Sequence, residues 1–324
     1  PIESVGYSVN MLCGSGMKST MIGAQDILTG EAELVLTGGM ENMSIAPYML
    51  DKARFGYRMG SGTVVDHMIR DGLTDVFNDY HMGVTAENLA EKYGISRLEQ
   101  DEFALESQKR AKEAIATGRF KDEIVPFVIK GRKGDVVFDT DEHPRDTSME
   151  ILGKLRPAFK KDGSVTAGNS SGINDGASAT VLASEEAVEK YGLKPIAEIV
   201  SFAQAGVDPA YMGFGPVPAV EKALKKVSMN IKDMELIELN EAFASQSLSV
   251  LKGLMEIYGV SKEWLLERTN VNGGAIALGH PIGASGNRII VTLLYEMEKR
   301  NLEFGLASLC IGGGMGTAVV VKRV

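Results

Sequence analysis

Two stretches of the chain, one near each end, repeat the same order of local features. The first contains, in order, Asn10, the loop Gly14-Ser15-Gly16, a helical pattern, the apolar run 34–37 and Gly38-Gly39. The second contains Asn272, the loop 283–286, a helical pattern, the apolar run 306–310 and glycines at 312–314. Each unit is predicted to fold as strand, glycine loop, helix, strand and glycine turn. This order favours a parallel α/β sheet with buried helices, and two copies predict two similar α/β domains related by a pseudo-twofold axis.

The two units differ in what comes before them. The second is preceded by the stretch from Pro195 to Val271, whereas the first is preceded by nine residues in which Val5, Tyr7 and Val9 alternate as in a strand. We therefore expect the first domain to lack its opening strands and helices in this chain. The edges of its sheet are then expected to be unpaired.

Composition limits the class of protein. The 324 residues, of which 44% are hydrophobic, are enough for one large or two ordinary domains. The net charge of −9 argues against a nucleic-acid partner. The two cysteines form no CxxC pair, and there is no secretory signal or apolar run of membrane-spanning length. We expect a cytoplasmic protein with no membrane association and no bound metal.

Cys13 is the first candidate catalytic residue. It precedes a helical pattern that begins at Ser15 and places Met17, Met21, Ala24 and Leu28 on one stripe. A thiol at a strand-to-helix turn, close to a helix N-terminus, is expected to have a lowered pKa and to act as a nucleophile. The alternative is a small buried cysteine beside a tight turn.

His280 and Cys310 are the next candidates. His280 lies between Gly279 and Pro281, in a rigid loop that suits a general base, although a hydrogen-bonded structural histidine is the alternative. Cys310 ends an apolar run before the glycines. If the two halves pair about a twofold axis, both residues are expected to converge on Cys13 and to supply a nucleophile, a base and a second acid/base.

Other segments set the organisation of the chain. Residues 47–166 are expected to form a long irregular insertion that contains one clear helix, opening at Ser96 with Glu99 as capping partner and stopping near Gly118. Two buried strands are expected, at 179–183 and at 236–239. Asn240 and Glu241 follow the second of these strands, a typical position for site residues. The 252–267 stretch is expected to be a surface insertion.

The sequence around the glycine and serine motifs excludes other common ligand-binding and catalytic motifs. The glycines at 312–316 follow a strand, but they lead into the apolar run 318–321 with no helix to hold a dinucleotide phosphate. The chain contains no GxxxxGK[ST] loop. Neither Ser15 nor Ser285 has the flanking residues of a GxSxG elbow.

Six spaced blocks carry a resemblance to a known family. They are LCGSG at 12–16, GGMENMS at 38–44, NDYHMG at 78–83, NEAFA at 240–244, GHPIGASG at 279–286 and CIGGGMG at 310–316. Together they resemble the thiolases over nearly the whole chain, and the acetyl-CoA acetyltransferase branch in particular. The HMG at 81–83 points to the short-chain branch.

The resemblance implies two α/β domains in a five-layer α/β/α/β/α arrangement with an inserted loop domain. The expected N-terminal domain comprises residues 1–46, with its start missing, and 166–194. The expected loop domain comprises 47–165 and the C-terminal domain 195–324. A homotetramer is also implied.

The resemblance also implies the chemistry. His280 takes the proton of Cys13, whose thiolate attacks acetyl-CoA to give an acetyl thioester. Cys310 deprotonates a second acetyl-CoA, and the enolate attacks the acetyl group to give acetoacetyl-CoA and CoA. The resemblance implies two oxyanion sites. One is formed by His280 and a water held by Asn240, and the other by the N–H groups of Cys13 and Gly312.

Coenzyme A enters as substrate and product, and no tightly bound cofactor is implied. By resemblance, the residues that bind it are Leu73, His81, Met82, Arg145, Ala167, Ser171, Met212 and Phe243. Two alternatives stay open: a 3-ketoacyl-CoA thiolase acting on longer chains, and a non-catalytic CoA-binding chain.

Overall fold

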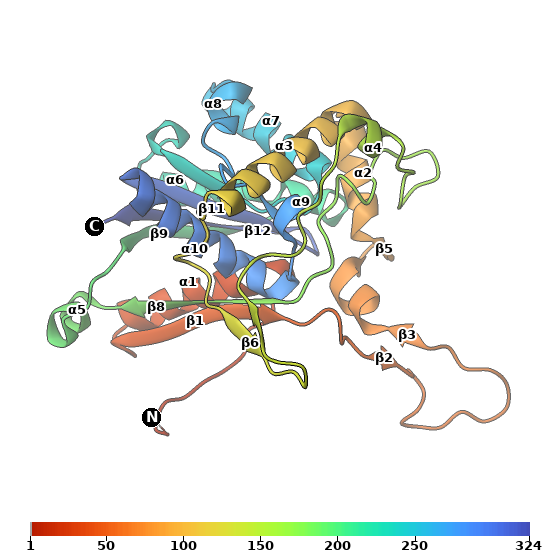
Figure 1. The fold of residues 1–324 in the computed structure, drawn as a ribbon, viewed down its shortest axis with the longest axis horizontal. Helices are drawn as coiled ribbons and strands as arrows, with labels where there is room; N and C mark the ends of the chain where they lie inside the picture. The colour runs from red at the N-terminus through yellow and green to blue at the C-terminus, as the bar shows by residue number, and fades with distance from the viewer. Residues whose placement is uncertain (1) are drawn as a thin grey trace.

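The computed structural model describes residues 2–324, whose helices and strands form layers (Figure 1). Two helices, α1 (Ser15–Leu28) and α10 (Ile282–Arg300), pack side by side between two sheets. The larger sheet contains β9 (Ala197–Gly206), β10 (Leu236–Leu239), β11 (Phe304–Ile311) and β12 (Met315–Arg323). The smaller sheet contains β1 (Leu34–Glu41) and β8 (Gly176–Ala183). On the far side of the larger sheet lie α6 (Pro216–Lys226) and α7 (Ala244–Tyr258).

The larger sheet has mixed strand directions, in the order β10-β11-β12-β9. Only β10 and β11 run parallel, and β12 is antiparallel to both of its neighbours. The prediction of a parallel sheet is therefore wrong for two of its three neighbouring strand pairs, because β12 runs opposite to the other three strands. The reason is the short turn after β11, where Gly313 and Gly314 each have a φ of +83°. A turn of this length joins antiparallel strands, because a parallel connection needs a crossover of a dozen or more residues.

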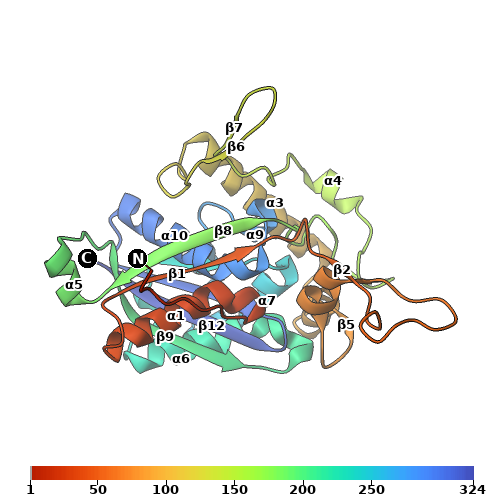
Figure 2. The same cartoon turned by 90° about the horizontal axis from the view of Figure 1, so that it is seen from below.

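The smaller sheet has one buried and one exposed face. β1 and β8 are antiparallel, pairing from Leu34↔Ala183 to Glu41↔Gly176, and one face packs on α1 and α10 (Figure 2). On the other face, Leu36 and Met40 are each 74% exposed and Val181 is 66% exposed. The prediction of a fully buried strand at 179–183 is therefore wrong, because alternate side chains point to opposite faces of a strand.

The residues before Cys13 do not form the predicted strand. Residues 4–10 pair with no strand in the described part of the chain, and Val5 is 95% exposed. An alternating pattern needs a neighbouring strand before its backbone groups are paired. The helix after Cys13 begins at Ser15 as predicted, with Met17 and Met21 buried, but Leu28 is exposed at its end.

Close contact between α1 and α10 brings the two repeated units together. A Cβ at Gly286 would lie 2.6 Å from the Met17 backbone nitrogen, and one at Gly16 would lie 2.8 Å from that of Asn287. Side chains are excluded at both positions, so the helix backbones approach directly. The N-terminal ends of both helices, where Cys13 and His280 precede them, are thereby held near the same end of the molecule.

The segment between β1 and β8 contains more regular structure than predicted. Helix α3 (Arg97–Ala116) begins at the predicted Ser96 cap, with the Glu99 capping box present. The segment also contains α2 (Met82–Lys92), α4 (Met149–Gly153), η2 (Met68–Leu73), β2 (Tyr48–Met49), β3 (Val65–Asp66), β4 (Thr74–Asp75), β5 (Tyr80–His81), β6 (Phe127–Ile129) and β7 (Val136–Phe138). The short hairpins have no long periodic pattern, which is why the sequence did not reveal them.

The 252–267 stretch is not a surface insertion. It comprises the end of α7 and the short helix α8 (Lys262–Leu266), and Leu254 and Leu265 are fully buried in the core behind the larger sheet. The remaining short elements are η1 (Leu12–Gly14), α5 (Glu185–Tyr191), η3 (Pro209–Phe214), η4 (Ile231–Asp233) and α9 (Ala275–Leu278).

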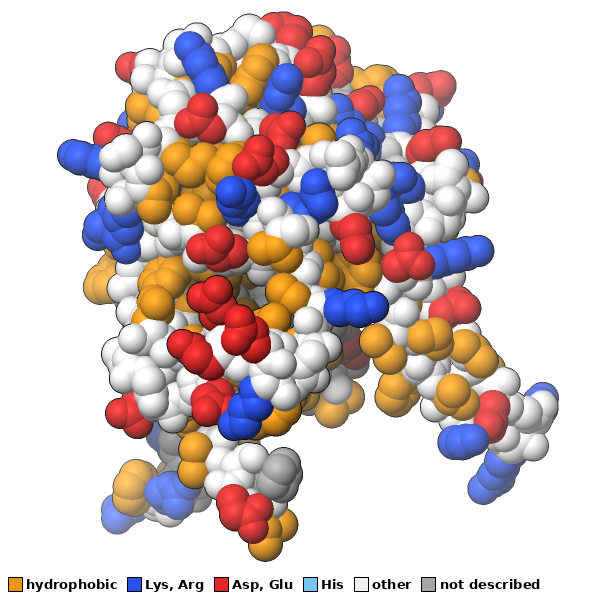
Figure 3. Space-filling view, turned by 90° about the vertical axis from the view of Figure 1, so that its left-hand side faces the viewer, with side chains coloured by type: hydrophobic (Ala, Val, Ile, Leu, Met, Phe, Trp, Pro, Cys, Tyr) orange, Lys and Arg blue, Asp and Glu red, His pale blue; other side chains and the backbone are white. Residues whose placement is uncertain are grey.

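The surface mixes charged and apolar groups. On the face drawn in Figure 3, acidic and basic side chains are interspersed, with apolar groups between them. Large exposed apolar side chains include Phe55, Phe127 and Val137, all in the segment between β1 and β8. Among residues 2–324, no helix has the length and apolar character needed to cross a lipid bilayer.

Candidate active site

Cys13 lies in η1, at a sharp corner in front of α1. Leu12, just before it, has a φ of +49°, a left-handed conformation that a leucine adopts only at an energetic cost. A Cβ at Gly14 would overlap the Ile311 side chain, so the corner is pressed against β11. The Ser15 hydroxyl closes the turn by donating to the Leu12 carbonyl and accepting from the Met11 N–H. The thiol is thus fixed in place by the backbone.

The surroundings of Cys13 favour the neutral thiol. Burial raises its pKa to about 11, although the N–H groups of Gly312 and of Cys13 itself act to lower it, and the nearby Glu41 raises it further. The prediction of a lowered pKa is therefore wrong. The side chain packs against the core cluster that contains Met17 and Ile311, and this loss of solvation outweighs the N–H groups around it.

Cys310 is the second thiol of the site. It lies near the end of β11, 1% exposed, and its pKa is raised first by burial and then by the charge of Cys13. The Gly312 N–H, two residues further on, acts on the Cys13 sulfur. The structure therefore brings Cys13, Cys310 and Gly312 together, as the sequence predicted.

His280 is buried, and its hydrogen bonds define its tautomer. Its Nδ1 lies 2.6 Å from Ser285 Oγ, and that hydroxyl in turn lies 2.9 Å from the Pro281 carbonyl oxygen. A hydroxyl has one proton, and the carbonyl can only accept, so Ser285 donates to Pro281 and accepts from His280. His280 therefore carries its proton on Nδ1. Its Nε2 is the nitrogen with a free lone pair.

The charge state of His280 follows from burial. Loss of solvation, with a smaller contribution from the Arg288 charge, lowers its pKa to about 4. The imidazole is therefore neutral at neutral pH. A neutral ring with an unprotonated Nε2 is able to accept a proton from a thiol.

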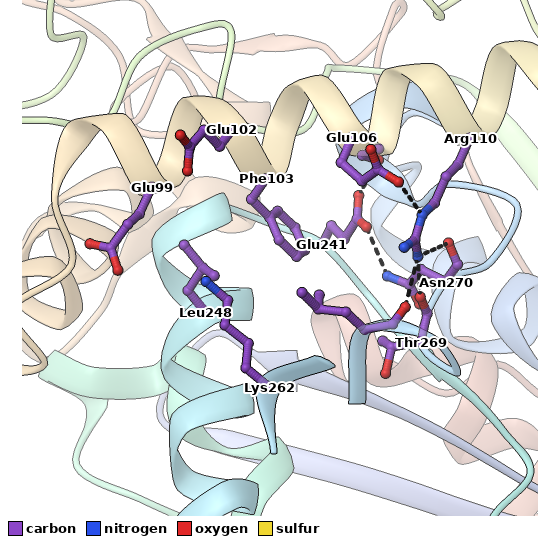
Figure 4. Close-up of a pocket in the computed structure, with 12 residues that line it drawn as sticks. Glu99, Glu102, Phe103, Glu106, Arg110, Glu241, Leu248, Lys262, Thr269 and Asn270 are labelled. Atoms are coloured by element: carbon purple, nitrogen blue, oxygen red, sulfur yellow. Dashed lines mark hydrogen bonds and ion pairs between the residues drawn. The ribbon is translucent and has the colours of Figure 1, made fainter. Parts of the chain in front are cut away.

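Asn240 and Glu241 face different parts of the molecule. The Asn240 Nδ2 lies 3.5 Å from His280 Nδ1, a long contact, and its buried Oδ1 has no hydrogen-bond partner among residues 2–324. Glu241 instead points toward α3, where it accepts from the Ser107 hydroxyl at 2.6 Å and the Asn270 amide at 2.8 Å (Figure 4). Only Asn240 of this pair therefore belongs to the site.

An apolar cluster surrounds Cys310. It brings together three of the residues predicted to bind coenzyme A, Met82, Met212 and Phe243, with Ala86, Val165, Ala242 and Phe159. His81 stacks on Phe159 with ring centroids 4.7 Å apart, and its Nδ1 accepts from the Gly83 N–H. Four of the eight predicted residues are thus gathered beside the second thiol.

The other four predicted residues lie outside this cluster. The Ser171 N–H donates to the Ala242 carbonyl at 3.0 Å, which places its backbone next to the cluster, and Ala167 is exposed nearby in the chain. Leu73 is half-buried at the end of η2. Arg145 is exposed, and its backbone N–H donates to Gln108 Oε1. No hydrogen bond within the described chain joins Leu73 or Arg145 to Cys13, His280 or Cys310, and neither residue is part of the apolar cluster around Cys310.

Three contributors to the site were missed from the sequence. Ser285 lies five residues after His280, and the sequence motifs do not indicate its hydrogen bond to that imidazole. Phe159 lies in the insertion, where no pattern marks it. Glu41, in the GGMENMS block, acts on Cys13 across the fold. The GGMENMS block marks Glu41 in the sequence, but it does not indicate that Glu41 acts on Cys13, which lies in another block.

Comparisons with known proteins agree with this geometry. A family model for the thiolase N-terminal domain matches residues 1–186, and one for the thiolase C-terminal domain matches residues 193–323. The chain therefore belongs to the thiolase family, and its fold is the thiolase fold.

Its relatives are acetyl-CoA acetyltransferases and thiolases. The acetyl-CoA acetyltransferase of Syntrophomonas wolfei is 56% identical over 100% of this chain and 81% of that relative. The one from Pseudomonas aeruginosa is 55% identical with the same coverage. A solved acetyl-CoA acetyltransferase of Syntrophomonas wolfei has a TM-score of 0.97 at 48% identity, over 100% of this chain and 81% of that one. Human mitochondrial 3-ketoacyl-CoA thiolase in complex with CoA has a TM-score of 0.93 at 47% identity, over 100% of this chain and 79% of that one.

Proposed function

We propose that this chain is an acetyl-CoA C-acetyltransferase, an acyltransferase that condenses two acetyl-CoA molecules to acetoacetyl-CoA and CoA and runs the reverse thiolysis. One observation carries the proposal: two thiols, the half-buried Cys13 and the buried Cys310, lie near each other, since Cys13 packs against the core cluster that contains Ile311, the residue after Cys310. A carbon–carbon bond formed between two thioesters needs a nucleophile that holds one acyl group and a base that activates the other.

In the first half-reaction, His280 accepts the Cys13 proton at Nε2 and the sulfur attacks the acetyl carbonyl. The tetrahedral adduct collapses with loss of CoA thiolate, which takes the proton back from His280. The N–H groups of Cys13 and Gly312 donate to the oxyanion, because both already act on the Cys13 sulfur. The product is acetyl-Cys13.

In the second half-reaction, His280 takes the Cys310 proton at Nε2, and the Cys310 thiolate removes a proton from the methyl group of a second acetyl-CoA. The enolate carbon attacks acetyl-Cys13, the Cys13–acyl bond breaks, and the Cys13 sulfur leaves as a thiolate that takes the Nε2 proton of His280. The enolate oxygen is stabilised by the Nε2–H of the protonated His280 and by a water bound to Asn240. The buried, unpartnered Asn240 Oδ1 supports this role, since such an oxygen is typical of one that bonds a water or ligand.

The apolar cluster supports a short acyl group. Met82, Met212 and Phe243 are each at most 8% exposed and pack around Cys310, which leaves little room beside the sulfur. Coenzyme A itself is proposed to lie along Leu73, His81, Arg145, Ala167 and Ser171. We also propose the division into residues 1–46 with 166–194, 47–165 and 195–324, and a cytoplasmic homotetramer, on the family resemblance.

Acetylation of Cys13 tests the proposal. The chain is mixed with acetyl-CoA, digested and mapped by mass spectrometry, and released CoA is counted. We expect one acetyl group, on the Cys13 peptide. The variant Cys310→Ser is expected to acquire the same acetyl group but to form no acetoacetyl-CoA, and Cys13→Ser neither. An unmodified Cys13 in a folded sample, or equal condensation by Cys310→Ser, would overturn the assignment.

A further inference from the structure

Glu41 joins the two repeated units at the site. It is the last residue of β1, and its Oε2 accepts a hydrogen bond from the Gly283 N–H at 2.9 Å, a contact between residues 242 apart in the chain. The neighbouring backbones are also in direct contact, since a Cβ at Gly39 would overlap the Gly283 carbonyl group and one at Gly283 would lie 2.7 Å from the Met40 oxygen. The end of β1 is therefore pressed onto the start of α10.

The contact supplies an acceptor that α10 otherwise lacks. This helix has 19 residues, and its N-cap, Pro281, provides no side-chain hydrogen bond. The first N–H groups of a helix need acceptors, and a carboxylate near them is favoured by the helix dipole. Glu41 fills this role from the other half of the chain. His280 lies just before the first turn that Glu41 holds, and Ser285 lies just after it.

The same carboxylate faces the Cys13 corner. Glu41 lines a cavity of about 280 Å³ together with Leu12, Ser15 and Ile282. Its charge raises the pKa of Cys13. The other titratable groups lining the cavity, His67 and Asp71, lie 3.2 Å from each other. From β11, the titratable group that faces Cys13 is Cys310.

We propose that Glu41 is a positioning residue for the acyl transfer proposed above, acting in two ways. Its hydrogen bond to Gly283 holds the turn that carries His280, and its carboxylate places a negative charge in the cavity beside Leu12 and Ser15, which flank Cys13. One side chain thereby acts on both the position of the base and the surroundings of the nucleophile. This inference rests on the proposed function, but its first test measures the alkylation of Cys13 and does not depend on catalytic activity.

Two substitutions separate the two roles. Glu41→Gln removes the charge but keeps an oxygen that accepts from Gly283, whereas Glu41→Ala removes both. Glu31→Gln, at an exposed loop position, is the matched control for loss of one carboxylate. Melting temperatures confirm that each variant is folded before comparison.

The first measurement is the rate at which iodoacetamide alkylates Cys13 between about pH 7 and pH 10, followed by peptide mapping. Removing a nearby negative charge favours the thiolate, so we expect Glu41→Gln to react about 3- to 10-fold faster than wild type at a given pH. Glu31→Gln is expected to follow wild type. A Glu41→Gln profile that superimposes on the wild-type profile would overturn the charge role, whether or not the chain condenses acetyl-CoA.

The second measurement is the steady-state thiolysis of acetoacetyl-CoA. We expect Glu41→Gln to keep kcat within a few-fold of wild type, because the turn is still held. We expect Glu41→Ala to lose at least about 10-fold in kcat with little change in KM, since a misplaced base affects the chemical step. Equal kcat values for the two variants would overturn the positioning role.

Discussion

Ser285 Oγ lies 2.6 Å from His280 Nδ1, and the same hydroxyl lies 2.9 Å from the Pro281 carbonyl oxygen. Because the single hydroxyl proton goes to the carbonyl, the imidazole proton is fixed on Nδ1. The structure therefore assigns the free lone pair to Nε2 without any ligand in the site. Ser285 and Pro281 both lie within five residues of His280, so the loop orients its own base.

Loss of the Ser285 hydroxyl is expected to slow catalysis. In Ser285→Ala the Nδ1–H has no buried acceptor at this position, and both tautomers become accessible. We expect kcat for thiolysis to fall by about 10-fold, which corresponds to the roughly 1–2 kcal/mol of one buried hydrogen bond. Ser249→Ala is the matched control, because that buried hydroxyl bonds only the Gln246 carbonyl of its own helix. Equal kcat values for Ser285→Ala and wild type would contradict this role.

The pH dependence of acetyl transfer to Cys13 is expected to show a broad plateau. The reaction starts from a protonated Cys13, whose pKa is raised to about 11, and an unprotonated His280, whose pKa is lowered to about 4. Both forms predominate between about pH 5 and pH 10, so the rate constant is expected to be nearly flat there. Stopped-flow detection of released CoA measures it. A bell-shaped profile with inflections between pH 6 and pH 8 would show instead that the two groups form an ion pair.

Gly312 is expected to be sensitive to a single added methyl group. A Cβ there would lie 3.0 Å from Leu12 Cδ1 and 3.3 Å from Met82 Cε, between the Cys13 corner and the apolar cluster. We expect Gly312→Ala to displace an oxyanion donor and to lower kcat by about 100-fold, in line with the roughly 3 kcal/mol that one such donor supplies. Gly206→Ala is the control in the same sheet, since the nearest atom to its Cβ lies 3.9 Å away. Similar kcat values for the two variants would argue against the role of Gly312.

Glu238 is expected to make the free energy of unfolding decrease as the pH rises. Burial raises its pKa to about 8, Arg288 lowers it in part, and neither carboxylate oxygen has a hydrogen-bond partner in the part of the chain described. The folded state therefore keeps a proton that the unfolded chain loses at its ordinary pKa of 4.5. Between these values the folded state binds more protons, so the free energy of unfolding decreases as pH rises.

Glu238→Gln tests that sign, since the amide is neutral at every pH. Relative to wild type, the free energy of unfolding of the variant is expected to increase between pH 5 and pH 8 by roughly 3–4 kcal/mol. Urea unfolding at both pH values measures it, with the exposed Glu198→Gln as the control. A difference between variant and wild type that stays constant with pH would contradict the prediction.

Local signals in the sequence predicted local structure well. The Ser96–Glu99 capping box, the start of α1 at Ser15 and the buried strand β10 are all confirmed, because each depends on residues a few positions apart. The motif blocks led to the thiolase family for the same reason. The strand predicted at residues 5–9 and the burial of 179–183 are wrong, because strand pairing and burial depend on segments far away in the chain.

The sequence by itself determined which residues we propose to carry the chemistry: Cys13, His280 and Cys310, each held in a glycine-rich block. Only the tertiary structure decided how they are protonated. The thiol of Cys13 is neutral rather than ionised, because burial against β11 and the Glu41 charge outweigh the nearby N–H groups. Loss of solvation is set by everything that packs around a group, and a local sequence pattern does not contain that information.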